Sequence, residues 1–248
     1  MRERIIIFSI FMLAAACAFA KEACKSSDKL TIEQILTKIT EKTDKLESFT
    51  SNIVYSLTED PEIFETTTSY TGNFRYLKTE TRQYAMLEFN ARKQDEFPIE
   101  KYRQTYIFDG VWLTRIDFPL KQINRDQIAE ENEPQDVFKL LSEDFPLIGF
   151  SGADKLADDY EIKLSEAKGG LYSLVLDAKE DANVAYGDIE FVIDSRDFLP
   201  RTIKATSTSD NSVCVIELDS VAVNENLTEK VFNIDMPEDF TISERKIE

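Results

Sequence analysis

The stretch that decides the fold runs from Tyr106 to Arg125 and reads YIFDGVWLTRIDFPLKQINR. Asp109-Gly110 separates two apolar-rich runs, a pattern typical of a tight hairpin in which both turn residues have positive φ. Phe118-Pro119 interrupts the second run, because proline cannot donate to a strand ladder. A third run starts at Leu120. Three short strands joined by two tight turns therefore predict an antiparallel sheet.

The first twenty residues have the pattern of a secretory signal peptide. An arginine-containing start precedes an apolar run from Ile5 to Ala16, and Ala18-Phe19-Ala20 is a small-x-small cleavage site. The run is too short to be a permanent membrane anchor. Ala14-Ala15-Ala16-Cys17 allows a second interpretation, a lipoprotein signal with Cys17 acylated after cleavage. We therefore expect an exported protein, with residues 1–20 as signal peptide and residues 21–30 as a flexible leader.

Charge and composition limit the partners and the chemistry. Residues 1–20 hold one of the 47 acidic and two of the 29 basic residues, so the mature net charge is −19. This charge repels nucleic acid and favours binding to a basic patch on a partner protein. The alternative explanation is that the charge only keeps the protein soluble. The chain has no histidine, which removes Ser-His-Asp triads, Cys-His pairs and HExxH zinc sites. We expect no enzyme, metal or cofactor; an exported hydrolase would be left with carboxylate or Ser-Lys chemistry.

Cleavage after Ala20 would leave two cysteines, Cys24 and Cys214. In an oxidising compartment the two can form a disulfide that ties the leader to a late strand. The alternative is two free thiols, one in the leader and one buried. The sequence leaves both alternatives open.

Hydrophobic spacing divides the remainder into a helix, many strands and a helical insertion. Residues 31–46 have apolar side chains at helical spacing, and Thr31 with Gln34 matches a capping box. From Phe49 the period changes to two, and strands recur until a last one at residues 232–241. Residues 130–159 break the pattern with helical stretches and an unusually apolar loop. This insertion is either a lid over a cavity or a plug that completes the core. We expect one domain at residues 31–248, with ten or eleven antiparallel strands.

Several segments carry a resemblance to a known family. They are SFTSNIVY at residues 48–55, TGNFRY at 71–76, the hairpin above, VFKLLSEDFPLIG at 137–149 and an ending V-x-x-N-x-x-L-x-x-x-x-F-x-I-x-x-P at 221–237. In this order and spacing they resemble LolA and LolB, the periplasmic carriers and receptors of outer-membrane lipoproteins. The resemblance covers residues 31–242. It implies an unclosed antiparallel β half-barrel whose concave, apolar face is covered by helices, a mainly β (α+β) fold.

The resemblance also implies a function. A protein of this family would bind lipoprotein acyl chains in the periplasm and pass them, as a monomer, from an inner-membrane releasing transporter towards an outer-membrane acceptor. One alternative is a half-barrel sensor or binding module of the cell envelope. Another is a membrane-anchored receptor, which requires an acylated Cys17.

Strand alternation supplies candidate residues for the wall of a lipid cavity. These are Phe74, Tyr76, Tyr84, Met86, Tyr106, Phe108, Trp112 and Ile116. The candidate lid residues are Phe138, Leu141, Phe145, Leu147 and Ile148. Carriers of the family have an arginine after the second strand that hydrogen-bonds to the lid. Lys78 stands there in this chain, and because lysine is a point donor, it would make a weaker latch.

Overall fold

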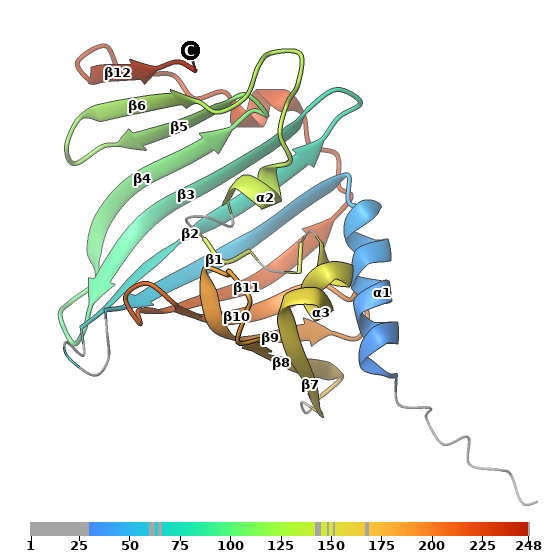
Figure 1. The fold of residues 1–248 in the computed structure, drawn as a ribbon. Helices are drawn as coiled ribbons and strands as arrows, with labels where there is room; N and C mark the ends of the chain where they lie inside the picture. The colour runs from blue at the N-terminus through green and yellow to red at the C-terminus, as the bar shows by residue number, and fades with distance from the viewer. Residues whose placement is uncertain are drawn as a thin grey trace, which may run out of the picture. The chain divides into compact units, whose positions relative to one another are not determined.

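The strands form one curved sheet whose two edge strands are β12 and β7 (Figure 1). The computed structural model describes residues 30–59, 63, 66–141, 145–147, 149–150, 152–166 and 169–247. Within them the strand order is β12-β6-β5-β4-β3-β2-β1-β11-β10-β9-β8-β7. The bounds are β1 (Ser48–Thr58), β2 (Thr67–Lys78), β3 (Gln83–Gln94), β4 (Glu100–Phe108), β5 (Trp112–Asp117), β6 (Gln122–Gln127), β7 (Tyr160–Glu166), β8 (Leu171–Ala178), β9 (Tyr186–Asp194), β10 (Pro200–Ser207), β11 (Val213–Val223) and β12 (Thr241–Arg245).

This architecture confirms the predicted fold class, an unclosed and mainly β structure. The described part of the chain has twelve strands, rather than ten or eleven. All neighbours pair antiparallel except β12, which runs parallel to β6. The last strand was predicted too early: it begins at Thr241, and a 3-10 turn, η2 (Glu229–Phe232), occupies the start of the predicted strand. The described residues from Thr31 onward form one compact unit. The predictions for the signal peptide, Cys17, Cys24 and Ile148 lie outside the described residues.

The hairpin at Asp109-Gly110 is present, but its turn differs from the prediction. Gly110 has a positive φ of 90°, whereas Asp109 is not among the residues with positive φ. The Asp109 carboxylate instead accepts hydrogen bonds from the backbone N–H groups of Val111 and Trp112, at 3.0 and 2.7 Å. An aspartate side chain that folds back on its own turn replaces one of the two left-handed residues.

The first helix, α1 (Ile32–Asp44), begins where the sequence predicts. Thr31 Oγ1 accepts from the N–H of Gln34, and the Gln34 side chain accepts from the N–H of Thr31, so the capping box is complete. The apolar stripe of α1 packs near β7 and a short turn, η1 (Ala153–Lys155). The other helices are α2 (Val137–Leu141) and α3 (Leu156–Asp159). None of the helices in the described ranges is long and apolar enough to cross a membrane.

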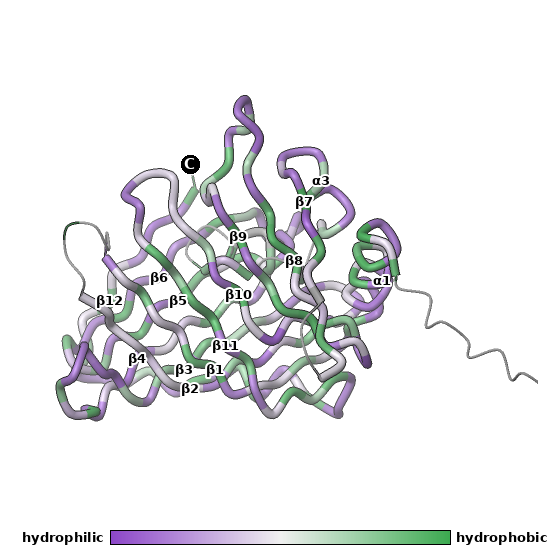
Figure 2. Tube along the Cα trace, turned by 90° about the horizontal axis from the view of Figure 1, so that it is seen from below, coloured by the Kyte–Doolittle hydropathy of each residue, from purple (hydrophilic) through white to green (hydrophobic). Residues whose placement is uncertain are grey.

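Apolar residues gather along the strands and α1, while the connecting loops are mostly hydrophilic (Figure 2). Most of the core lies on the concave face, which carries Phe49, Phe74, Phe89 and Phe191, all fully buried. A smaller cluster lies on the convex face and consists of Leu77, Met86 and Phe232. The segment around η2 crosses the convex face and covers this cluster. The sheet is therefore buried on both faces near its middle.

A bulge interrupts the pairing of β2 with β3 at Thr71 and Gly72. A Cβ atom at Gly72 would overlap the backbone of Glu88 on the neighbouring strand. Only glycine permits this close approach of two backbones. The requirement is one of space and not of φ, since Gly72 is not among the glycines with positive φ.

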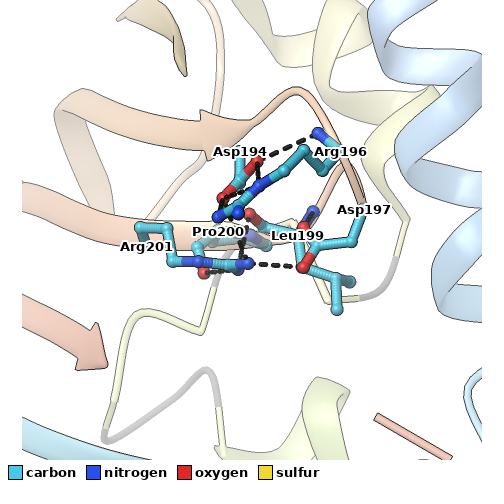
Figure 3. Close-up of polar contacts among 6 residues, drawn as sticks. All are labelled: Asp194, Arg196, Asp197, Leu199, Pro200 and Arg201. Carbon is cyan, nitrogen blue, oxygen red and sulfur yellow. Dashed lines mark hydrogen bonds and ion pairs between the residues drawn. The ribbon is translucent and has the colours of Figure 1, made fainter. Parts of the chain in front are cut away.

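An ion-pair cluster fixes the turn between β9 and β10 (Figure 3). The carboxylate of Asp194, with 6% of its side chain exposed, accepts from Arg196 at 2.5 Å and lies 3.5 Å from Arg201. Arg201 also pairs with Asp197. The hydrogen bonds from Arg196 lower the pKa of Asp194 to about 2. Phe198 has a φ of 57° in this turn, so the cluster holds a non-glycine residue in the left-handed region.

Candidate functional site

The described residues of the insertion, 137–141, 145–147, 149 and 150, lie on the concave face of the sheet and are called here the plug segment (Figure 1). At one end, the ring of Phe138 lies 4.6 Å from that of Tyr76 on β2. Phe150 stacks on Phe138 at 5.1 Å and meets Phe49 of β1 edge-on at 5.2 Å. Aromatic rings of the plug segment thus interdigitate with rings of the two central strands.

Phe145 anchors the middle of the plug segment to a different part of the sheet. Its ring meets Tyr55 and Tyr106 edge-on at 5.2 and 5.3 Å, and lies 6.3 Å from Phe89. The predicted lid residues Phe138, Leu141, Phe145 and Leu147 are all buried, as is Phe150. In this structure the plug segment therefore completes the core rather than covering an empty cavity.

Four of the eight predicted wall residues face the plug segment. Phe74 and Tyr76 on β2 lie on the concave face, opposite Leu87 and Ala85 of β3. On β4, Phe108 lies opposite Ala85, and Tyr106 opposite Leu87. The register therefore places Phe74, Tyr76, Tyr106 and Phe108 on one surface.

The other four predicted wall residues lie on the convex face, which corrects the prediction. Tyr84 and Met86 belong to the cluster beneath Phe232, whose ring is 5.6 Å from that of Tyr84. Trp112 stacks under the guanidinium of Arg125, and Ile116 is buried between strands on that same face. The alternation within each strand was predicted correctly, but the faces of β3 and β5 were reversed.

Among the described residues, the side chain of the predicted latch residue bonds to α1 and not to the plug segment. Lys78 Nζ lies 3.5 Å from the carbonyl oxygen of Asp44, at the end of α1. The side-chain amide of Gln83 holds the start of α2 instead. Its Oε1 accepts from the N–H of Val137 at 3.1 Å, and its Nε2 donates to Asp136 at 3.3 Å. This contact was missed because glutamine has no distinctive sequence signal for such a role.

An aromatic pocket of about 240 Å³ opens on the concave face beside Phe145. Its lining combines rings and aliphatic side chains with two polar ones: Tyr55, Leu57, Tyr70, Phe89, Gln104, Tyr106, Arg115 and Phe145. Concave sites with mostly apolar walls and a few polar groups are typical of small-ligand binding. Phe145 forms one wall, so movement of the plug segment would enlarge the aromatic pocket.

Burial disfavours ionisation of two tyrosine hydroxyl groups and one thiol in this region. It raises the pKa of Tyr102 to about 12, and that of the Cys214 thiol to about 12. Desolvation raises the pKa of Tyr55 as well. None of these groups is charged near neutral pH, so they offer a hydroxylic or apolar surface and no nucleophile. Cys214 is a free thiol here, and its pairing with Cys24 stays a prediction.

Within the described ranges, no group of three or more cysteine or carboxylate residues is arranged to hold a metal ion. The aromatic pocket combines rings and tyrosine hydroxyl groups with the polar side chains of Gln104 and Arg115. Such a surface can bind and release a chain-like apolar molecule.

Comparison with known proteins gives structural matches only. No family model matches the chain, and no curated protein matches it. An uncharacterized conserved protein from Thermus thermophilus matches 86% of this chain and 98% of its own, at 12% identity and TM-score 0.49. A putative outer membrane lipoprotein-sorting protein domain from Vibrio parahaemolyticus matches 81% of this chain and 95% of its own, at 10% identity and TM-score 0.40.

A third match is the MucA/MucB complex of Pseudomonas aeruginosa, at 16% identity and TM-score 0.41. It covers 82% of this chain, and this chain spans 61% of that one. Lipoprotein-sorting proteins, which the sequence resembles, are thus among the structural matches. The fold assignment rests on the sheet itself.

Proposed function

We propose that this protein is an exported carrier whose concave face binds acyl chains by displacing the plug segment. The observation that supports it most directly is the contact of Phe145 with Tyr55 and Tyr106 at one wall of the aromatic pocket. The plug segment places apolar side chains where a chain-like ligand would lie. Such a binding protein needs no reactive group, so the proposal does not include enzymatic activity.

A plug that competes with the ligand solves the problem of release. Burying one methylene contributes about 0.8 kcal/mol, so a triacylated anchor with on the order of 40 methylenes would contribute roughly 30 kcal/mol. Non-covalent complexes rarely exceed about 20 kcal/mol, and a carrier must bind far more weakly than that. Displacing the rings of Phe138, Phe145 and Phe150 from the sheet costs free energy, and this cost lowers the net free energy gained on binding. The complex therefore stays reversible without an energy source of its own.

The proposed transport route is inferred from the resemblance of the sequence to the LolA and LolB family. The carrier would take lipoproteins from an inner-membrane releasing transporter to an outer-membrane acceptor through the periplasm, after removal of residues 1–20. The mature net charge of −19 favours docking on a basic patch of such a partner.

A second candidate function is a binding or sensor module of the cell envelope. The observation that favours it is the close packing of the plug segment, in which Phe138, Leu147 and Phe150 are buried. If the plug segment never leaves the sheet, ligand recognition falls to the outer surface. Such a protein would bind a protein partner and no lipid.

Titration of delipidated mature protein with a fluorescent fatty acid and with a triacylated peptide tests the proposal. Binding of either should be accompanied by faster amide hydrogen exchange in residues 137–141, because the ligand displaces the plug segment. Binding of neither ligand would reject the carrier function and favour the second candidate. Binding with unchanged exchange in α2 would reject displacement of the plug.

A further inference from the structure

A second pocket lies on the concave face between Tyr106 and the edge strand β12, and its volume is about 430 Å³. Its lining is mostly polar. It consists of Tyr106, Leu113, Arg115, Asn124, Asp126, Ser243 and Arg245. We call it the arginine pocket. Arg115 lies opposite Tyr106 on one side and opposite Asn124 on the other. Tyr106 and Arg115 line both pockets, so the arginine pocket adjoins the aromatic pocket.

Arg115 has no counter-ion in direct contact. No described residue forms a hydrogen bond or an ion pair with it, and its side chain is exposed. The neighbouring Asp126 is already paired, since Arg245 Nε lies 2.6 Å from its carboxylate. Asp117, the next acidic residue on this face of β5, accepts from Gln104 Nε2 at 3.2 Å. Asp126 attracts Arg115 at longer range, but both nearby carboxylates form their hydrogen bonds with other residues. The N–H donors of Arg115 are therefore available.

We propose that the two pockets together bind an amphiphile, with its acyl chain in the aromatic pocket and an oxyanion head group on Arg115. The head group is a carboxylate or a phosphate. This inference rests on the proposed function, because it requires an acyl chain beside Phe145. It adds the charge that the carried molecule bears.

Geometry favours an oxyanion over other polar groups. A guanidinium presents paired N–H donors that match a carboxylate or a phosphate. The amide of Asn124 and the hydroxyl of Ser243 line the same pocket and add neutral donors. Asp126 is the one carboxylate of the lining, and Arg245 offsets its charge.

The acyl chain is required as well as the anion. Arg115 is exposed, and an exposed ion pair on its own adds only a small factor to the affinity. The mature net charge of −19 also repels free anions. Burial of the chain brings the anion to Arg115, where the two contributions add. A free inorganic anion should therefore bind poorly.

Three ligands with the same chain separate the contributions: dodecanoate, dodecyl phosphate and the uncharged dodecanol. Each is titrated by calorimetry into the delipidated mature protein at low ionic strength, with inorganic phosphate as a fourth ligand. The variants are Arg115→Gln, which removes the charge, and Arg115→Lys, which keeps the charge but loses the paired N–H donors of the guanidinium. Lys101→Gln is the matched control, since it removes one exposed positive charge from β4, on the opposite face.

The proposal predicts that the wild type binds at least one of the two anions up to about fivefold more tightly than dodecanol, as expected for an exposed ion pair. Arg115→Gln should abolish the difference between the anions and dodecanol. Arg115→Lys should retain part of this difference, and Lys101→Gln should retain all of it. The preferred anion identifies the source, a fatty acid or a phosphorylated lipid.

Other results would overturn the inference. Equal binding of all three chains by the wild type would reject the head-group site and leave the carrier function intact. An equal effect of Lys101→Gln would indicate a long-range charge effect, and strong binding of inorganic phosphate alone would indicate a free-anion site. If no chain binds, the carrier function fails together with the inference.

Discussion

Substituting Phe145 by alanine tests whether the plug segment competes with the ligand. The ring is 5% exposed and meets Tyr55 and Tyr106 at 5.2 and 5.3 Å. Replacing a buried phenylalanine by alanine costs about 3–5 kcal/mol, and the loop on which it lies can partly collapse into the space. We therefore expect Phe145→Ala to lower the free energy of unfolding by about 3 kcal/mol.

The same substitution should strengthen ligand binding. In the wild type, a ligand that enters the enlarged aromatic pocket must first remove the Phe145 ring, and this cost lowers the observed affinity. If only a third of the roughly 3 kcal/mol is recovered, the affinity for a fluorescent fatty acid rises about fivefold. Urea denaturation followed by circular dichroism measures the stability, and fluorescence titration measures the affinity.

Phe232→Ala is the matched control. Its ring is 4% exposed and packs on Tyr84, but on the convex face. It should lower stability by a similar amount and leave the affinity for the fatty acid unchanged. The reasoning would be refuted if Phe145→Ala bound the fatty acid no more tightly than the wild type while Phe232→Ala behaved as expected.

Three further perturbations follow from the structure. Gln83→Ala should speed hydrogen exchange at Val137 about fivefold, because an orphaned helix N–H costs about 1 kcal/mol, whereas Lys78→Ala should not change it. Asp194→Asn should reduce stability by about 1–2 kcal/mol at pH 7 in urea denaturation, a value discounted for the exposed arginine partner. Because the folded pKa of about 2 lies below the unfolded value of about 4, this difference should shrink as the pH falls from about 4 to about 2, and persistence below pH 2 would contradict it. Gly72→Ala should disrupt the pairing of β2 with β3 and lower the melting temperature by more than about 5 °C; an unchanged melting temperature would argue against the close approach.

The local chemistry of the chain was sufficient to predict most elements. The capping box at Thr31, the hairpin at Asp109-Gly110 and the apolar insertion at residues 137–150 were all visible as short patterns. Each depends on residues close together in the chain, where spacing determines geometry. The choice between lid and plug was not visible, because it depends on how far the insertion sinks into the concave face.

The faces of β3 and β5 could not be predicted for a different reason. Alternation shows which residues of a strand share a face, but it does not show which face is concave. Turn lengths and bulges set that choice, as at Gly72. The convex face of β3 also carries apolar side chains, Tyr84 and Met86, because the segment around η2 covers that face. A strand that is buried on both faces has no polar face, so its sequence pattern does not show which face is concave.

The pairing of β1 with β11 has a consequence for how the chain folds. Phe49 lies opposite Val223, so the centre of the sheet joins residues from opposite ends of the chain. Strands β2–β6 and β7–β11 are each built from neighbours in sequence and can form early. The two meanders cannot join until β11 has been synthesised and has found β1. We therefore expect a late, slow step in refolding, and this step should be absent from a fragment that ends before β11.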